Sequence, residues 1–358
     1  MPVARDSVTV GAMQRHIPKL LSRARALLGL RGGPPGELAR TEVRRAADAV
    51  LRLHAGLVGE RALARPETYQ GELLGAYLLW WWPQTYLKTQ AALRMAPLPR
   101  APRILDVGSG PAPAALAALD LLGGEATCFD LSEPALAEAR ALGVQRTVRE
   151  LPAEEFDLTL AANVLSEVGD PAALLRKLTG TIVIIEPALR ETGRALLRLR
   201  DTLLAEGFAK ALAPCLTQKP CPALASSKDW CTAELRWKPP RFFLQLAEAT
   251  GLRADEMLSF APLILARKAP EPPCDLWRVV GVPLPEKGKK RIWVCSDAGR
   301  VAVGRLDKHA SAENAPFDEL CRGDLVRLTS LEQRGDGLRL QPGVSRVERV
   351  VPGVEPLP

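Results

Sequence analysis

Apolar residues recur every three or four positions through much of the first hundred residues, the spacing of helices that bury one face. Residues 17–30 and 43–63 carry this pattern, and RGGPPGE at 31–37 predicts a turn between them. A third helix is predicted over residues 70–95. Together these segments predict a helical N-terminal domain over residues 1–100.

Trp80, Trp81 and Trp82 lie at the centre of the third predicted helix and are followed by Pro83, which would kink or restart it. Three adjacent tryptophans on a helix cannot all face one core. They could dock the helix on the next domain, line a pocket or stack a nucleic-acid base. Docking is the favoured interpretation, because each tryptophan offers a large apolar surface.

From residue 101 short apolar runs alternate with helical segments. The predicted strands are RILDVGSG, ATCFDLS, FDLTLAANVL, TIVIIEP and EMLSFAPLILARK, and the predicted helices include APAALAALDLLG, PALAEARALG and GRALLRLRDTLLAEGFAKAL. This alternation predicts a mostly parallel sheet with helices on both faces. Residues 101–270 are therefore predicted to form one α/β domain, with an insertion at about 211–240 at an edge of its sheet.

The remainder of the chain consists of short strands separated by Gly, Pro and Asp turns: LWRVVGVPL, RIWVCSD, RVAVGRL, DLVRLTSLEQ and LRLQPGV. About five such strands predict a small barrel of the OB or a similar type over residues 271–358. The last residues, PGVEPLP, are predicted to be a frayed tail.

Of the 358 residues, 47% are hydrophobic and 25% are charged, a composition typical of a soluble globular protein. The net charge of +7 permits a polyanionic partner such as RNA. The most apolar patch, ELLGAYLLWWW, is too short to span a bilayer, so no membrane partner is expected. The N-terminus lacks a signal-peptide pattern, which predicts a cytoplasmic protein with reduced thiols.

The segment DVGSGPA follows the first predicted strand and resembles the first motif of class I S-adenosylmethionine-dependent methyltransferases. Gly108 and Gly110 would let the backbone turn tightly and approach a ligand at a helix N-terminus. In that family Asp106 lies by the methionine end of the cofactor, and Asp130 would accept hydrogen bonds from both ribose hydroxyls. Ala112 stands where a third glycine is common. The alternative is a degenerate Rossmann fold that binds no cofactor.

Asn163 lies at the end of the predicted strand in FDLTLAANVL, where the catalytic groups of such enzymes gather, and it is predicted to belong to the cofactor site. Enzymes that methylate amino groups of nucleic acids typically carry two prolines and an aromatic residue after this position. Here the next residues are Val164, Leu165 and Ser166. No nucleophile or general base stands out, so no catalytic residue is predicted.

Four cysteines carry the strongest chemical signal. Cys215, Cys221 and Cys231 lie in the irregular, Pro-rich segment APCLTQKPCPALASSKDWCT, and Cys295 lies on a later predicted strand. Thiolates are preferred ligands of zinc and of iron–sulfur clusters, and either site needs four ligands. The spacing is looser than that of the tight cysteine pairs in structural zinc sites, which suits a larger cluster without excluding zinc.

Buried free thiols are the alternative interpretation, and it fits Cys128, which lies inside an apolar strand. Cys274 and Cys321 are spare thiols, either of which could replace Cys295 as the fourth ligand. A cage that includes Cys295 would join the insertion to the C-terminal domain. Cys221→Ser is then expected to destabilise the C-terminal half, because metal binding would be part of folding.

Two basic features could contact phosphates, although a run of charges is more often a solvated face. One is KGKKR on a predicted turn, and the other is a row of arginines on the helix after TIVIIEP. Their residues are Lys287, Lys289, Lys290 and Arg291, and Arg190, Arg194, Arg198 and Arg200.

The order of these features resembles the methyltransferase-like assembly factors of the mitochondrial ribosomal small subunit and their bacterial relatives. The resemblance rests on AYLLWWWPQTYLKTQAAL, APCLTQKPCPA, DWC, EMLSFAPLILARK, WRVVGVP and GKKRIWVCSDAG, and it covers most of the chain from about residue 70. It implies an α/β, Rossmann-like class I methyltransferase fold with a helical N-terminal domain, a Cys-rich insertion and a small C-terminal β-barrel-like domain. It also implies a 4Fe–4S cluster held by Cys215, Cys221, Cys231 and Cys295, and binding to small-subunit ribosomal RNA.

The predicted function is that of a ribosomal small-subunit assembly factor, or rRNA methyltransferase-like protein, that binds S-adenosylmethionine and an iron–sulfur cluster. Methyl transfer is left open, because the resemblance also implies a scaffolding role. The alternative is a small-molecule methyltransferase with a structural zinc site, and a third possibility is an RNA-binding scaffold without cofactor. No DNA partner is expected.

Overall fold

The computed structural model describes residues 8–58, 70–268 and 275–351. The α-helices are α1 (Val8–Gln14), α2 (Ile17–Leu28), α3 (Arg40–Val58), α4 (Glu72–Leu93), α5 (Pro113–Leu122), α6 (Glu133–Leu142), α7 (Pro171–Arg176), α8 (Arg190–Ala205) and α9 (Arg241–Thr250). The first eight strands are β1 (Arg103–Val107), β2 (Glu125–Phe129), β3 (Arg146–Val148), β4 (Leu158–Ala162), β5 (Thr181–Pro187), β6 (Lys210–Ala213), β7 (Ala233–Arg236) and β8 (Met257–Ala266).

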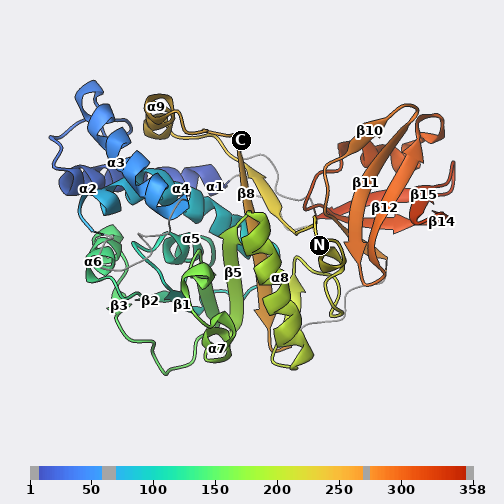
Figure 1. Ribbon diagram of the computed structural model, residues 1–358, viewed down its shortest axis with the longest axis horizontal. Helices are drawn as coiled ribbons and strands as arrows, with labels where there is room; N and C mark the ends of the chain where they lie inside the picture. The colour runs from blue at the N-terminus through green and yellow to red at the C-terminus, as the bar shows by residue number, and fades with distance from the viewer. Residues whose placement is uncertain (1–7, 59–69, 269–274, 352–358) are drawn as a thin grey trace.

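These eight strands form one sheet in the order β3-β2-β1-β4-β5-β8-β6, with β7 pairing with β8 beside β6 (Figure 1). Strands β1 to β5 are parallel, and β8 is antiparallel to β5, β6 and β7. The run 3-2-1-4-5 is the strand order of Rossmann-like folds, and its ligands bind at the carboxyl ends of the strands. The predicted mostly parallel sheet is confirmed.

Successive residues of the strands alternate between two cores, because side chains along a strand point to opposite faces of the sheet. In β5, Val183 and Ile185 face the helices α4, α5, α6 and α9, whereas Ile182 and Ile184 face α7 and α8. Both faces are thus covered, which is why TIVIIEP is apolar throughout.

The N-terminal helices do not form a separate core. Helices α2, α3 and α4 pack into the same apolar cluster as one face of the sheet. Within α4, Trp82 is fully buried and its Nε1 donates to the carbonyl of Pro111 at 3.0 Å. Trp80 stacks on Phe243 of α9 with 4.1 Å between ring centroids. Docking, the favoured interpretation of these tryptophans, is confirmed, and α4 continues through Pro83 as one helix.

The predicted helix over 193–212 ends earlier than its apolar spacing indicates. Helix α8 ends at Ala205, Gly207 has a φ of 68°, and Lys210–Ala213 forms strand β6 on β8. The left-handed turn at Gly207 stops the helix, and the edge of β8 supplies new backbone partners. The Cys-rich insertion therefore lies between two strands, β6 and β7, which both pair with β8.

The C-terminal strands are β9 (Leu276–Val279), β10 (Leu284–Glu286), β11 (Lys289–Ser296), β12 (Gly299–Leu306), β13 (Leu325–Thr329), β14 (Leu331–Arg334), β15 (Gly337–Leu340) and β16 (Arg346–Val351). They pair in the order β14-β15-β12-β11-β9-β13-β16, with β10 on β11. The predicted strand DLVRLTSLEQ is split in two at Ser330, where φ is 56°. Across the described strands the hydrogen bonding leaves β14 and β16 at opposite ends, so it does not close a barrel. The tail PGVEPLP lies outside the described residues.

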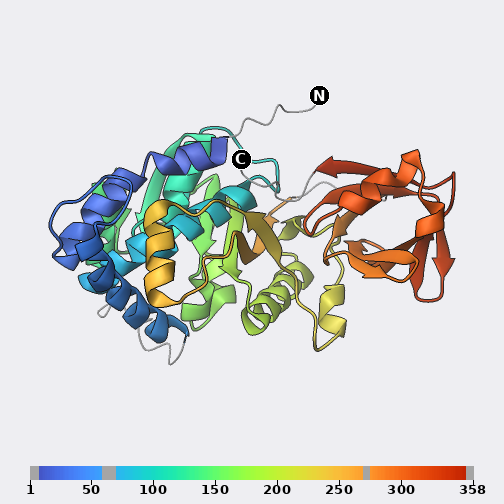
Figure 2. The same ribbon diagram turned by 90° about the horizontal axis from the view of Figure 1, so that it is seen from above.

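Figures 1 and 2 show the two sheets at opposite ends of an elongated molecule, with the N-terminal helices on the far side of the first sheet. The segment between β6 and β7, yellow in both views, lies between the two sheets. Within the described ranges no helix is long and apolar enough to cross a membrane.

Candidate functional site

The four cysteines predicted to bind a metal line one cavity at the junction of the two sheets. Cys215 follows β6, Cys221 precedes the short helix η3 (Pro222–Ala225), Cys231 precedes β7 and Cys295 lies on β11. The cavity has a volume of ≈ 40 Å³. About 10–15 Å³ suffices for one water molecule, so the cavity that the thiols help to line has room for more than one water.

The remaining cysteines lie elsewhere. Cys128 is buried in β2, as expected for a packing thiol. Cys321 is exposed, does not line the cavity, and its thiol donates to the carbonyl of Glu319 at 3.5 Å. Cys274 lies outside the described residues. Of the three candidates for the fourth ligand, Cys295 is the one that the described structure places with the other thiols.

The arrangement differs from that of a site for one metal ion. Over residues 8–58, 70–268 and 275–351, no three His, Cys, Asp or Glu side chains are grouped so that they could hold a single ion. Four thiolates around one zinc ion lie about 3.8 Å apart, because the tetrahedral Zn–S bonds are about 2.3 Å long. The four thiols share the lining of one cavity.

Three arginines place positive charge against the same cavity. Arg278 on β9 and Arg300 on β12 are both in register with Cys295 on β11. Residues opposite one another in an antiparallel pair share a face of the sheet, so both guanidinium groups accompany the thiol. Arg200 of α8 comes from the other side and is 0% exposed, with its Nε unpartnered among the described residues. These cations favour ionised thiols.

Burial and the neighbouring thiols, in contrast, raise the pKa of the cysteines and favour the neutral thiol. Burial, followed by the charge that Cys215 would carry, raises the pKa of Cys231 and of Cys295 to about 12. The pKa of Cys221 is raised for the same two reasons. The raised pKa values favour neutral thiols at Cys221, Cys231 and Cys295 at pH 7, so binding of a metal group has to release their protons.

Three of the four α8 arginines predicted as candidate phosphate contacts donate to the backbone of the Cys-rich segment. Arg200 is buried and donates to the carbonyls of Thr217 and Lys219, the latter at 2.9 Å. Arg190 and Arg194 also donate to backbone carbonyls, and Arg198 stays exposed. Their acceptors are Ser227 for Arg190 at 2.8 Å, and Ser226 and Asp229 for Arg194 at 2.6 and 2.7 Å.

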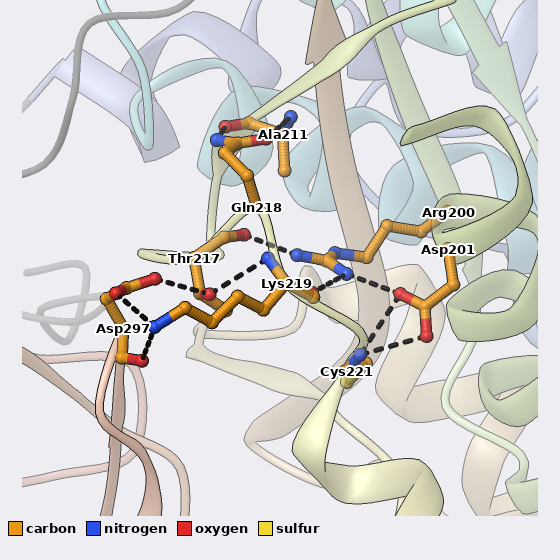
Figure 3. Close-up of polar contacts among 8 residues, drawn as sticks. All are labelled: Arg200, Asp201, Ala211, Thr217, Gln218, Lys219, Cys221 and Asp297. Atoms are coloured by element: carbon orange, nitrogen blue, oxygen red, sulfur yellow. Dashed lines mark hydrogen bonds and ion pairs between the residues drawn. The ribbon is translucent and has the colours of Figure 1, made fainter. Parts of the chain in front are cut away.

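Polar contacts also join the Cys-rich segment to the C-terminal sheet. Asp297, in the β11–β12 turn, accepts from the Thr217 hydroxyl at 2.8 Å and from Lys219 Nζ at 2.7 Å (Figure 3). On the same segment the backbone N–H of Cys221 donates to both carboxylate oxygens of Asp201, at 2.9 and 3.1 Å. These contacts join the Cys-rich segment to the C-terminal sheet without a metal group, and the link through a metal cage stays a prediction.

The KGKKR turn is partly neutralised by Glu286 of its own hairpin and by Asp318 from a later segment. Lys289 and Arg291 both pair with Glu286, and Lys290 pairs with Asp318 at 3.4 Å. These surface pairs are weak, so the side chains stay available to a stronger anion.

The second predicted site lies at the carboxyl edge of the first sheet. Gly108 and Gly110 have φ values of 64° and 52°, in the left-handed region that glycine tolerates. A Cβ at Gly108 would lie 2.4 Å from Cγ2 of Val164, so this turn has no room for a side chain. Ala112 adopts a φ of 58° at the position of the missing glycine and is the N-cap residue of α5. The replacement therefore keeps the loop conformation.

Asp106 and Asp130 meet at this loop. Asp106 is 1% exposed and accepts the Ala115 N–H at 2.9 Å, and burial, with the nearby charge of Asp130, raises its pKa to about 7. Asp130 accepts the N–H groups of Gly110 and Ser132, each at 2.8 Å. A carboxylate has about four lone-pair sites, so each oxygen of Asp130 can accept a further hydrogen bond from a ligand hydroxyl.

Asn163 follows β4, the strand that pairs with β1 at the same carboxyl edge. Its backbone N–H donates to Ile185 at 2.7 Å, and its φ of 58° is left-handed. Its side-chain Nδ2 donates to Thr85 of α4 at 3.4 Å. Helix α4 thus closes over the carboxyl edge, and the burial of Tyr77 on the same helix, together with the charges of Asp106 and other acids, raises the pKa of that phenol.

Two acids at this edge are absent from the sequence prediction. Glu186, near the end of β5, is 2% exposed: its Oε1 accepts the Leu165 N–H at 3.0 Å, and its Oε2 is buried without a partner among the described residues. Burial raises its pKa to about 7, and the charge of Glu167 adds to this. Burial also raises the pKa of Glu167 to about 7. The signal for Glu186 is a carboxylate that ends an otherwise apolar strand.

Replacing Glu186 with glutamine is expected to change the pH dependence of stability. Because the folded-state pKa is raised to about 7, the wild-type contribution is full below about pH 4 and is lost as the pH rises through 7. Glu186→Gln removes this loss and should raise the free energy of unfolding by up to about 3 kcal/mol at pH 8, with little change at pH 4. Urea unfolding at both pH values measures the difference, and an equal effect at both would contradict it.

The parallel sheet, the two-sided helical cover and the glycine turn at the carboxyl edge define a Rossmann-like class I methyltransferase fold. The family model described as mitochondrial small ribosomal subunit Rsm22 matches residues 74–313, more than half of the chain. The chain belongs to the Rsm22 family. The matched region runs from α4 through all four cysteines of the cavity. A comparison with curated proteins finds no match.

Solved structures with a related fold are distant. A chain of the Haloferax volcanii complex of the Trm112 methyltransferase activator with a methyltransferase is 14% identical, with 51% of this chain and 90% of that chain covered and a TM-score of 0.33. The plantazolicin methyltransferase BpumL, in complex with a substrate analogue and SAH, is 12% identical, with coverages of 64% and 100% and a TM-score of 0.34. An RNA methyltransferase from Pyrococcus horikoshii is 11% identical, with coverages of 62% and 96% and a TM-score of 0.32. These scores are low, and nothing about ligands follows from them.

Proposed function

We propose that this chain is an assembly factor of the small ribosomal subunit, a methyltransferase-like protein that binds small-subunit ribosomal RNA. The observation that carries the proposal is the Rsm22 family match over residues 74–313, which contains both candidate sites. The family description names the small ribosomal subunit and supports a ribosome-related, methyltransferase-like protein. Ribosomal RNA as the direct partner is our further step, and the net charge of +7 supports it.

The four-cysteine cavity is the proposed site of a 4Fe–4S cluster. Cys215, Cys221, Cys231 and Cys295 would be its ligands, and the lining of one cavity by all four thiols supports the assignment. When bound, such a cluster supplies bonds that join the Cys-rich segment to the C-terminal sheet. The surrounding arginines would offset the negative charge of the four thiolates, and the backbone contacts of Arg200 would hold the loop in place.

The carboxyl edge is the proposed site of S-adenosylmethionine, which supplies an electrophilic methyl group when bound. Gly108 and Gly110 would allow its close approach, and Asp130 would accept hydrogen bonds from its ribose hydroxyls. Asp106 would lie by the methionine end, and Asn163 would border the site from β4. We leave methyl transfer open and assign no catalytic residue.

The three-part division into residues 1–100, 101–270 and 271–358 also remains a proposal, as does the cytoplasmic location. The first part shares its core with one face of the first sheet. The second and third parts have cores of their own.

The test of the proposed function is RNA binding by the anaerobically purified chain. Affinity is measured for small-subunit ribosomal RNA and for a transfer RNA over a range of salt concentrations. We expect tighter binding to the ribosomal RNA, with an affinity that falls steeply with salt because phosphate contacts release counterions. Equal affinity for both RNAs would argue against a role at the small subunit.

The second candidate is a small-molecule methyltransferase with a structural zinc site, favoured by the methyltransferase fold alone. It predicts one zinc ion per chain and no RNA in the purified protein. A third, the RNA-binding scaffold without cofactor, predicts RNA binding but no heat on titration with S-adenosylmethionine.

A further inference from the structure

A second cavity, of ≈ 210 Å³, lies where α4, α9 and the start of β8 meet. We call it the Lys88 cavity. The residues that matter for its chemistry are Gln84 and Lys88 of α4, Trp237, Arg253, Asp255 and Ser259. It is separate from the four-cysteine cavity, with which it shares none of its lining residues.

Lys88 is a cation that lacks a countercharge. Its side chain is half-buried, and within the described ranges it has neither an ion pair nor a hydrogen bond. Burial lowers its pKa to about 8, so it still carries its charge at pH 7. The buried Arg25 and Arg305 differ, since Glu42 and Asp318 neutralise them at 2.8 and 2.7 Å. A half-buried unpaired charge costs stability unless an anion joins it.

The rim of the cavity adds to this positive charge. Arg253 and Asp255 both line the cavity and lie 3.7 Å apart, with side chains 88% and 57% exposed. A long, exposed pair of this kind interacts weakly, so Arg253 can turn toward a ligand. One carboxylate and two cations leave a net charge of +1, and the Ser259 hydroxyl offers a further donor.

The cavity adjoins the cofactor edge through α4. Thr85, which contacts Asn163 at the end of β4, lies between Gln84 and Lys88 in the sequence. The two residues that face the cavity are thus within one helical turn of the residue that meets the proposed cofactor site. Trp237, 2% exposed, closes the opposite wall, where its Nε1 is held by the carbonyl of Asp255 at 2.9 Å.

We infer that the Lys88 cavity is a phosphate site, in which Lys88 neutralises a phosphate group of an RNA strand beside the cofactor edge. A phosphate matches the cavity because it brings negative charge and several acceptor oxygens to a site with two cations and a hydroxyl. The phosphate chemistry stands on the cavity alone. The choice of RNA as its source rests on the proposed function.

The test compares the wild-type chain with Lys88→Met and with Lys238→Met. Lys238 is an exposed lysine beside Trp237 that does not line the cavity, so it controls for the loss of one charge. Inorganic phosphate is titrated by calorimetry at pH 7, and a fluorescent single-stranded RNA is titrated at several salt concentrations.

We expect Lys88→Met to weaken phosphate and RNA binding by about 10-fold or more and to lower the salt slope for RNA by about one. Lys238→Met should change either affinity by less than about 3-fold. Lys88→Met should also melt at a higher temperature than the wild type, because it removes a half-buried unpaired charge. This separates loss of binding from loss of folding.

Absence of phosphate binding in the wild type, or equal binding by the wild type and Lys88→Met, would overturn the site. Loss of phosphate binding with an unchanged RNA affinity and salt slope would overturn RNA as the source. If the wild type binds phosphate through Lys88 but binds no RNA, the phosphate site stands and the proposed function fails.

Discussion

Cys221→Ser is expected to strip iron and inorganic sulfide from the anaerobically purified chain and to lower its stability by about 4 kcal/mol or more. Serine keeps the size of the side chain but removes a thiolate ligand, and the energy of binding a metal group at a site formed by folding is folding energy. The loss should appear as a drop of roughly 10 °C in the melting temperature. It should be largest for contacts between the Cys-rich segment and the C-terminal sheet, which the cavity joins.

The matched control is Cys321→Ser, which changes an exposed thiol on the C-terminal part of the chain that does not line the cavity. It should keep the metal content and the melting temperature of the wild type. Unchanged iron, sulfide and melting temperature in Cys221→Ser would refute the cage. Loss of metal in Cys321→Ser would show that the wrong fourth ligand has been assigned.

Gly108→Ala is expected to abolish measurable binding of S-adenosylmethionine and to destabilise the chain by about 2–5 kcal/mol. The added Cβ would lie 2.4 Å from Cγ2 of Val164, at a φ of 64° that alanine adopts only with strain. The loop would have to move away from the position that lets a ligand approach. Calorimetric titration and urea unfolding measure the two effects.

Gly207→Ala separates backbone strain from the clash, since Gly207 has a φ of 68° but open space around the position of a Cβ. This variant should cost about 1–2 kcal/mol and bind the cofactor as the wild type does. Retained cofactor binding in Gly108→Ala would place S-adenosylmethionine elsewhere or nowhere. Equal destabilisation by the two variants would show that the Val164 side chain moves away at little cost, so that the clash with it does not matter.

Local patterns predicted most of the first sheet, because its strands are short apolar runs bounded by glycine turns. They failed where a distant segment decides the outcome. The helix preceding the Cys-rich segment was extended too far, since apolar spacing cannot anticipate that Lys210–Ala213 would pair with β8. Similarly, one residue at Ser330 divides a predicted strand in two.

For the candidate sites too, local sequence patterns could not reveal contacts with distant segments. The sequence singled out the four cysteines that line one cavity, because thiols are rare and their chemistry is specific. It could not find Arg200, whose position on a row of helical arginines looks like a solvated face. Arg200 can be buried because its guanidinium group donates hydrogen bonds to the carbonyls of Thr217 and Lys219, which come from a distant segment. Glu186 and Lys88 were missed for a similar reason, since their lack of a partner is visible only in three dimensions.

The central claim is that four cysteines from two parts of the chain hold one iron–sulfur cluster. Anaerobic purification followed by visible spectroscopy, with iron, sulfide and zinc determination, tests it most directly. We predict a brown, oxygen-sensitive protein with about four iron and four sulfide per chain. A colourless protein with one zinc per chain, or one with no metal at all, would contradict it.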